Sequence, residues 1–166
     1  MKRKNSNLDE RIKKLHQEEI DTLMVAIVVS EFNSSITEQL LMGAVSLLKK
    51  LSLDDQYKMV SVPGSFEIPL AAQKLAQSGE FDAIVCLGCV IQGETSHFDY
   101  ICQQVSRGVG EVGLKYGLPV TFGVITADTL EQAEERADTE RGNKGADAAL
   151  CAVEMAILME RLTGNG

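Results

Sequence analysis

The sequence has few basic residues and no long hydrophobic segment. Its 166 residues include 16 Lys and Arg against 24 Asp and Glu, a formal net charge of −8. A nucleic-acid partner is not expected, because neutralising phosphates requires a basic face. The longest unbroken apolar run, residues 23–29, is too short to cross a bilayer, so no membrane partner is expected either. The basic start leads into Asp9 and Glu10 instead of the apolar core of a secretory signal, which predicts a cytoplasmic protein.

The chain has four cysteines, and their spacing does not favour a metal or redox site. Cys86 and Cys89 form a C-x-x-C pair, but they lie in "AIVCLGCV", a run typical of a buried strand. Strand residues three apart point to opposite faces, so structural packing is favoured over zinc or redox chemistry. No P-loop motif occurs. The G-x-G-x-x-G match at residues 108–113 lies inside a helical pattern, where a dinucleotide fingerprint is not expected.

The chain divides near residue 21. Residues 1–21 carry six basic and five acidic side chains, with only a weak helical repeat of Leu8, Ile12 and Leu15. We interpret them as an N-terminal arm that packs late, pairs with a neighbouring subunit or stays mobile. Residues 22–166 are predicted to form a single domain.

Strands and helices alternate from residue 22 onwards. Apolar, β-branched runs predict strands over 22–30, 57–62, 82–91 and 119–126. Helical spacing predicts helices over 36–51, from Ser65, over 98–116, from Asp128 or Thr129 to 137, and over 145–162. Ser35 and Glu38 predict a capping box at the first of these helices. This alternation predicts a four-stranded parallel sheet in a three-layer α/β/α sandwich, a flavodoxin-like fold.

Residues suited to ligand binding follow the predicted strands, at the sheet edge where such folds bind ligands. Phe32 and Phe66 can sandwich a flat ring, and Glu67 can accept hydrogen bonds from a polyol. The turn 93–95 can hold a phosphate, and His97 suits proton transfer near neutral pH. Rim packing, helix capping and a surface histidine remain alternative interpretations of these residues.

Two cations near the C-terminus also allow two interpretations. Arg136 and Lys144 flank a glycine-containing turn in an otherwise acidic chain. They indicate either an anion site or a solvated pair that balances the neighbouring glutamates.

Several segments together resemble one known family. The stretches "FNSSIT", "VPGSFEIPLAAQKLA", "GCVIQGETSHFDYI", "GLPVTFGVIT", "EQAEERA" and "GNKGADAALCAVEMA" resemble the lumazine synthase (6,7-dimethyl-8-ribityllumazine synthase) family of riboflavin biosynthesis, over about residues 23–160. The resemblance implies a transferase that joins 5-amino-6-(ribitylamino)uracil to 3,4-dihydroxy-2-butanone 4-phosphate. It implies no metal and no redox cofactor.

The resemblance also implies roles for individual residues. His97 would be the acid–base catalyst, and Arg136 would bind the phosphate. Glu94 stands where the family has a small residue, and Gln92 where a basic one is common. The substrate-binding residues implied are Phe32, Ser65, Phe66, Glu67, Cys89, Val90, Ile91, Glu94, Thr95, Phe122, Arg136 and Lys144.

Assembly is implied in the same way. Phe122 and Arg136 would come from the adjacent subunit of a homo-oligomer. The family forms pentamers, some of which assemble into icosahedral shells of about 60 subunits. The segment 131–144 carries no insertion, which resembles the shell-forming members, and riboflavin synthase would be a partner. The alternatives are a non-catalytic flavin-binding or cage-forming paralogue and a flavodoxin-like mononucleotide carrier.

Overall fold

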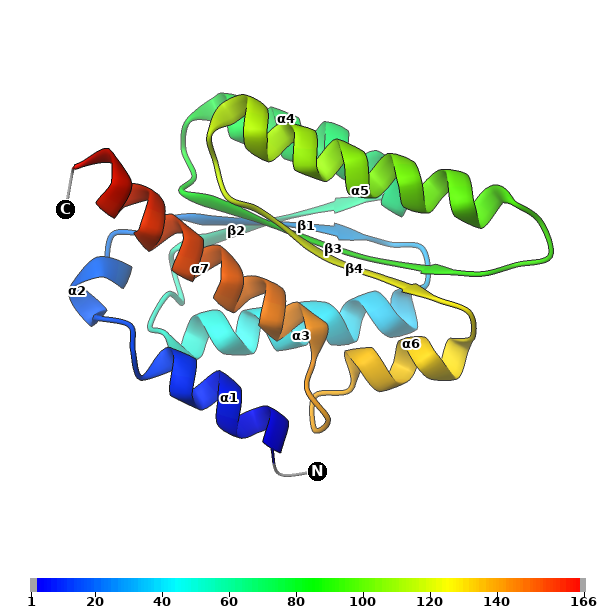
Figure 1. Ribbon diagram of the computed structural model, residues 1–166, viewed down its shortest axis with the longest axis horizontal. Helices are drawn as coiled ribbons and strands as arrows, with labels where there is room; N and C mark the ends of the chain where they lie inside the picture. Colours follow the sequence, from blue (N-terminus) through cyan, green and yellow to red (C-terminus); the bar gives the residue numbers. More distant parts are fainter. Residues whose placement is uncertain (1–2, 165–166) are drawn as a thin grey trace.

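Four parallel strands form the centre of the computed structural model, which describes residues 3–164 (Figure 1). They pair in the order β2-β1-β3-β4, and the four predicted strands are confirmed. Their bounds are β1 (Val25–Ser30), β2 (Tyr57–Val62), β3 (Ala83–Ile91) and β4 (Val120–Ala127). The apolar runs of the central strands β1 and β3 are continuous because helices cover both faces of the sheet.

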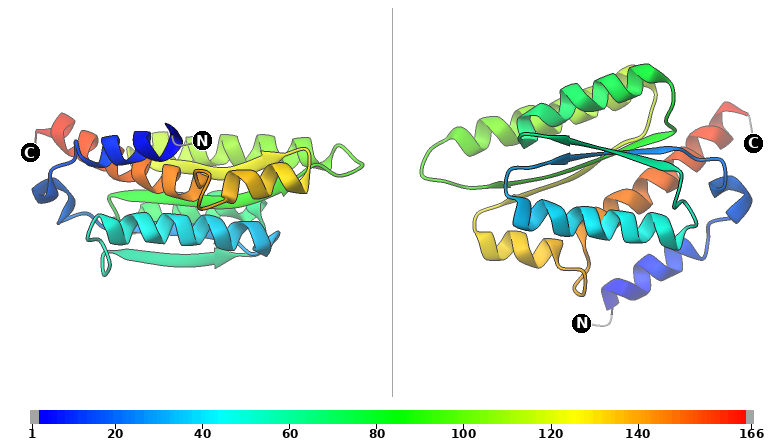
Figure 2. Two further views of the ribbon diagram at one scale, coloured as in Figure 1. Left: turned by 90° about the horizontal axis from the view of Figure 1, so that it is seen from below. Right: turned by 180° about the vertical axis from the view of Figure 1, so that it is seen from behind.

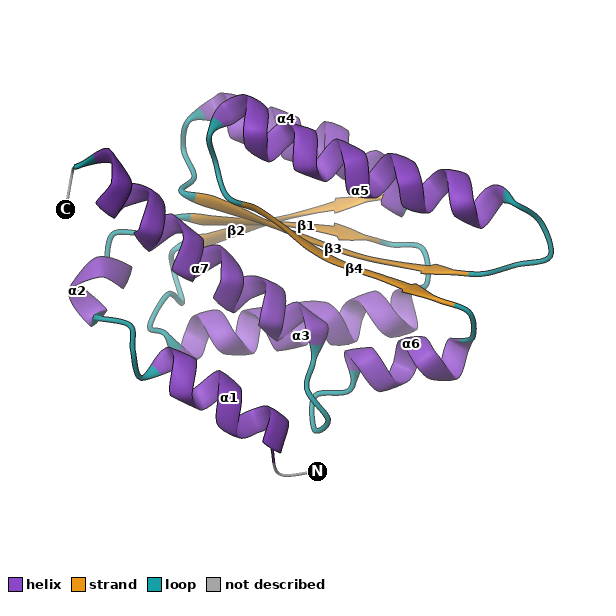
Figure 3. Ribbon diagram, in the orientation of Figure 1, coloured by secondary structure: helices purple, strands orange, loops and turns teal. Residues whose placement is uncertain are grey.

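The helices form the two outer layers, as Figures 2 and 3 show. Helices α4 and α5 cover one face, whereas α3, α6 and α7 cover the other. The fold is therefore the predicted three-layer α/β/α sandwich of flavodoxin type. No helix within residues 3–164 is long and apolar enough to span a membrane. The helix bounds are α1 (Arg3–Ile12), α2 (Gln17–Ile20), α3 (Ser34–Lys50), α4 (Ile68–Ser78), α5 (His97–Tyr116), α6 (Leu130–Ala137) and α7 (Lys144–Thr163).

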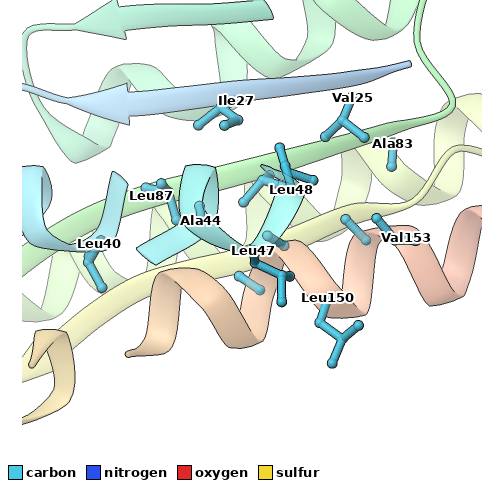
Figure 4. Packing of buried hydrophobic residues seen from close by; sticks show 14 of the residues in the cluster. Val25, Ile27, Leu40, Ala44, Leu47, Leu48, Ala83, Leu87, Leu150 and Val153 are labelled. Carbon is cyan, nitrogen blue, oxygen red and sulfur yellow. The ribbon is translucent and has the colours of Figure 1, made fainter. Parts of the chain in front are cut away.

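The larger apolar cluster fills the space between the sheet and the α3–α7 layer. Figure 4 shows Ile27 and Leu87 of the sheet with Leu40, Leu48 and Leu150 of these helices. All five side chains are completely buried. This packing holds the strand ends, and the loops that follow them, in fixed positions.

The two cysteines of β3 belong to different sides of the sheet. Cys86 packs in the cluster under α4 and α5, and Cys89 packs in the cluster under α3 and α7, which confirms the opposite-face prediction. Burial raises the pKa of the Cys86 thiol to about 12 and that of Cys89 to about 11. Both thiols therefore stay protonated at neutral pH.

The N-terminal arm lies against its own chain. Leu8, Ile12 and Leu15 pack on the α3–α7 cluster, so the weak apolar repeat becomes the buried face of α1 and its following turn. Arg11 forms an ion pair with Glu154 of α7. At the other end of the arm, Arg161 pairs with Glu19 at 2.7 Å.

Candidate active site

A cavity of about 610 Å³ opens beyond the carboxyl ends of β1 and β3. These strands are neighbours, but β1 continues into α3 on one face and β3 into α5 on the other. The cavity therefore lies at the switch point where open α/β sheets bind ligands. Nine predicted site residues line it, namely Phe32, Ser65, Phe66, Glu67, Cys89, Val90, Ile91, Thr95 and His97.

Two aromatic rings stand open to solvent at this cavity. Phe32 follows β1 and is 70% exposed, and Phe66 follows β2 and is 51% exposed. Exposed aromatic rings beside a cavity are typical of a site that contacts another flat ring. The backbone of Phe32 is held in place, because its N–H donates to the carbonyl oxygen of Pro63 at 3.1 Å.

The start of α3 differs from the predicted capping box. The helix begins at Ser34, one residue before the predicted cap at Ser35, and its N-cap is Asn33 in the left-handed conformation, with φ of 59°. The Asn33 side chain makes no capping bond. It reaches β3 instead, so the capping-box prediction from Ser35 and Glu38 is wrong. A tertiary contact has replaced the local one.

Two buried hydroxyl groups meet above Gly88 of β3. Ser30 is 1% exposed and Ser65 is 6% exposed, and neither hydroxyl has a hydrogen-bond partner among the residues described. A Cβ at Gly88 would lie 2.7 Å from Ser65 Oγ and 3.2 Å from Ser30 Oγ. Glycine is therefore required there. Of these two residues, only Ser65 lines the cavity.

The start of α5 forms the polar wall of the cavity. His97 is the first helical residue and is exposed, and its backbone N–H donates to Thr95 Oγ1 at 3.4 Å. The N-terminus of this long helix presents free N–H groups and a partial positive charge. Glu94 is exposed and does not line the cavity. This wall can therefore attract an anion through backbone groups, beside an imidazole.

The remaining predicted residues lie elsewhere on the chain. Phe122, Arg136 and Lys144 line a second cavity of about 400 Å³ along β4. Phe122 is 43% exposed on this edge strand and pairs in register with Cys86 in mid-sheet, away from the strand ends. One chain thus carries two separate groups of predicted site residues.

The two cations of this second cavity differ in their contacts. Lys144 pairs with Asp147 at 2.9 Å. The Arg136 guanidinium donates to the carbonyl oxygen of Gln132 at 2.8 Å and belongs to none of the ion pairs found in the described part of the chain. Arg136 therefore keeps its charge available for an external anion.

Gly93, from the turn predicted to hold a phosphate, also lines the first cavity. Four further residues line it without having been predicted, namely Asn33, Gly64, Phe98 and Ile101. Each adjoins or lies within one turn of a predicted residue, so proximity along the chain was the signal that could have found them. Among residues 3–164, no group of three or more His, Cys, Asp or Glu side chains is arranged to hold a metal.

The fold and this site define a flavodoxin-like α/β protein with an open ligand cavity at the carboxyl ends of its sheet. Residues 22–160 match the sequence model of the 6,7-dimethyl-8-ribityllumazine synthase family. The chain belongs to this family of transferases of riboflavin biosynthesis.

Proposed function

We propose that the protein condenses 5-amino-6-(ribitylamino)uracil with 3,4-dihydroxy-2-butanone 4-phosphate to give 6,7-dimethyl-8-ribityllumazine, inorganic phosphate and water. One observation carries the proposal. In a chain of this family, the switch-point cavity brings two exposed aromatic rings, a free buried hydroxyl and an imidazole to one place.

The pyrimidine substrate suits the apolar half of the cavity. Phe32 and Phe66 provide the aromatic contact for its ring. The Ser65 hydroxyl and the Glu67 carboxylate provide polar contacts for the ribityl chain. Cys89, Val90 and Ile91 line the cavity at the end of β3. Their backbone groups would form its hydrogen bonds to the ring, since these side chains are weakly polar or apolar.

The phosphate substrate suits the polar wall. The backbone at Glu94 and Thr95 precedes α5, where the helix dipole favours an anion. The Glu94 side chain stays outside the cavity lining, so its charge does not occupy the anion position. Arg136 would provide the main counter-charge and Lys144 a second one.

The reaction moves protons at several steps, and His97 is placed to move them. The amine of the pyrimidine attacks the ketone, and water leaves as an imine forms. Removal of a proton then allows the phosphate to depart with the electrons of its C–O bond. The second nitrogen closes the ring and water is lost again. An imidazole can take and return these protons near neutral pH, while the cavity holds both reactants together.

A complete site requires two copies of the chain. Arg136 and Phe122 lie in a different cavity from His97, and Phe122 is exposed on the edge strand. In a ring of subunits, the β4 edge of one copy would complete the strand-end cavity of the next. We extend the proposal to pentamers that close into an icosahedral shell, with riboflavin synthase as a partner. Native mass measurement tests this assembly, and a lone pentamer or a decamer would contradict the shell.

The activity is tested by following lumazine formation optically, with the uncatalysed condensation subtracted. We expect turnover above this background. His97→Ala should lower kcat by up to about 100-fold without abolishing it, because orientation of the reactants persists. His16→Ala is the matched control, since His16 is exposed in the arm. Arg136→Ala should raise KM for the phosphate substrate far more than for the pyrimidine.

The proposal is overturned if the protein shows no turnover while it still binds the pyrimidine or a flavin. That result would favour a non-catalytic flavin-binding or cage-forming paralogue, or a flavodoxin-like mononucleotide carrier.

A further inference from the structure

The connection between α6 and α7 sets the position of two cations. Arg136 lies in the last turn of α6, and Lys144 is the first residue of α7. Both line the cavity along β4. Their spacing therefore depends on how the end of one helix is fixed to the start of the next.

One buried side chain joins these two helix ends. Asn143 is 5% exposed, and its Nδ2 donates to the carbonyl oxygens of Ala137 at 2.5 Å and Gln39 at 2.8 Å. Its Oδ1 accepts from the backbone N–H of Ala146 at 3.0 Å. A single amide thus ties the C-terminus of α6, the body of α3 and the N-terminus of α7. The Ala137 carbonyl belongs to the residue that directly follows Arg136.

Two helical glycines make room for this amide. A Cβ at Gly43 of α3 would lie 2.1 Å from Asn143 Oδ1, and one at Gly145 of α7 would lie 2.0 Å from the carbonyl oxygen of Leu40. Glycine inside a helix costs about 1 kcal/mol relative to alanine. Two such glycines therefore lie where α3 and α7 approach each other around Asn143, and both lower the intrinsic stability of their helices.

We propose that Asn143 is a positioning residue for anion binding by Arg136 and Lys144. It does not touch the substrate, and its effect runs through the end of α6. Ala133 and Ala137 are completely buried against α3 and α7, so packing would still hold α6 on the sheet. Without the two donated bonds, however, the last turn of α6 would lose its hydrogen bonds to Asn143, and the backbone that carries Arg136 would be less precisely positioned. This inference rests on the proposed function, in which the anion is the phosphate group of the four-carbon substrate.

Two variants remove the donated bonds but keep the helix cap. In Asn143→Ser, the hydroxyl can still accept from Ala146 N–H but is too short to reach the Gln39 and Ala137 carbonyls. In Asn143→Asp, a carboxylate that only accepts replaces the donor. Both should raise KM for the phosphate substrate about tenfold and leave KM for the pyrimidine within about twofold, because a displaced binding group affects only the reactant that it holds.

The control is Val153→Ala, which truncates a completely buried side chain on the same helix, away from its N-terminus. It should lower Tm without changing KM for the phosphate substrate. If KM for the phosphate substrate and KM for the pyrimidine change equally in the Asn143 variants, Asn143 has only a structural role and the inference is overturned. A rise of KM for the phosphate substrate in Val153→Ala as large as theirs would overturn it as well.

Inorganic phosphate provides a readout that does not need turnover. Calorimetric titration of the assembled protein should give a dissociation constant about tenfold weaker in Asn143→Ser than in the unmodified chain. If the unmodified chain binds phosphate but forms no lumazine, the proposed function fails, and weaker phosphate binding in Asn143→Ser would still support the inference. If the unmodified chain does not bind phosphate, or if both proteins bind it equally, the inference fails.

Discussion

The side-chain amide of Asn33 donates a 2.9 Å hydrogen bond to the backbone carbonyl oxygen of Cys89. This bond joins the loop after β1 to the last part of β3, and both residues line the strand-end cavity. Phe32 precedes Asn33 directly, so the bond helps to hold an aromatic ring whose side chain is otherwise free in solvent.

Breaking this bond should weaken pyrimidine binding. Asn33→Gly keeps the positive φ at little cost but removes the donor. We expect the dissociation constant for the pyrimidine to rise about threefold to tenfold, as the loss of one ordinary hydrogen bond implies. Fluorescence or calorimetric titration measures this constant.

The control uses the other non-glycine residue with positive φ found in the described chain. Ser52 has φ of 63° and lies beyond the opposite end of α3. Ser52→Gly should leave pyrimidine binding unchanged. Unaltered affinity in Asn33→Gly would show that the Asn33–Cys89 bond does not position Phe32.

Ser65→Ala should separate stability from binding. A buried hydroxyl without a partner costs about 1–3 kcal/mol, so its removal should leave the Tm of the ligand-free protein unchanged or raise it. Affinity for the pyrimidine should fall several-fold, because the ribityl chain loses a partner. Thermal unfolding and ligand titration of the same variant test both effects.

Ser30→Ala is the matched control for Ser65. Its hydroxyl is also buried and unpartnered, but it does not line the cavity. This variant should gain stability without losing affinity. A marked fall in Tm for Ser65→Ala would mean that its hydroxyl is bonded within the ligand-free protein.

The buried thiol of Cys86 should make folding sensitive to alkali. The thiol titrates near 9 when exposed, and burial raises its pKa to about 12. Between these values the unfolded chain releases a proton that the folded chain keeps, so the free energy of unfolding falls as pH rises. Cys86→Ala should reduce this fall, as urea unfolding at several values between about pH 8 and about pH 10.5 would show. An identical slope in both proteins would contradict the buried position of Cys86.

The sequence predicted the sheet well because its two central strands, β1 and β3, are buried on both faces. "AIVCLGCVI" and "VAIVVS" contain almost no polar residues, and only a covered parallel sheet accommodates such runs. Thr129 was one of two predicted caps for the next helix, and it does accept from the N–H of Gln132 at 3.2 Å. These features depend on residues close together in the chain.

Features that depend on distant residues could not be predicted. The Asn33 side chain does not cap its helix and instead donates a hydrogen bond to the carbonyl oxygen of Cys89, which lies 56 residues further along the chain. The arm's ion pair with its own chain joins Arg11 to Glu154, which lies 143 residues further along the sequence. One glycine of the G-x-G-x-x-G match is likewise explained by a contact with a distant residue. It lies within α5, and a Cβ at Gly108 would come within 2.7 Å of Pro69 on α4.

The family resemblance implies that Phe122 and Arg136 come from an adjacent subunit, and within a single chain these two residues line a cavity other than the one that His97 lines. Residues after β1, β2 and β3 meet because the carboxyl ends of parallel strands share one edge. Phe122 is the third residue of β4, far from the carboxyl end of this strand, so no topology rule brings it to that edge. The relation between its cavity and the strand-end cavity belongs to the assembly, which one sequence pattern does not encode.

We propose that each active site is built from the strand-end cavity of one subunit and the β4 edge of another, and mixing of variants tests this arrangement directly. Joint refolding or co-expression mixes two variants that are impaired in different half-sites, His97→Ala and Arg136→Ala, and the mixture is assayed at a phosphate-substrate concentration at which each variant alone retains little activity. In a ring of randomly mixed subunits, about a quarter of the sites would carry both native halves, so activity should return to about that fraction of the unmodified rate. His97→Ala mixed with Phe32→Ala is the control, because both changes affect the same half-site and no complete site can form. Activity in the first mixture that stays at the average of the separate variants would contradict a site shared between subunits.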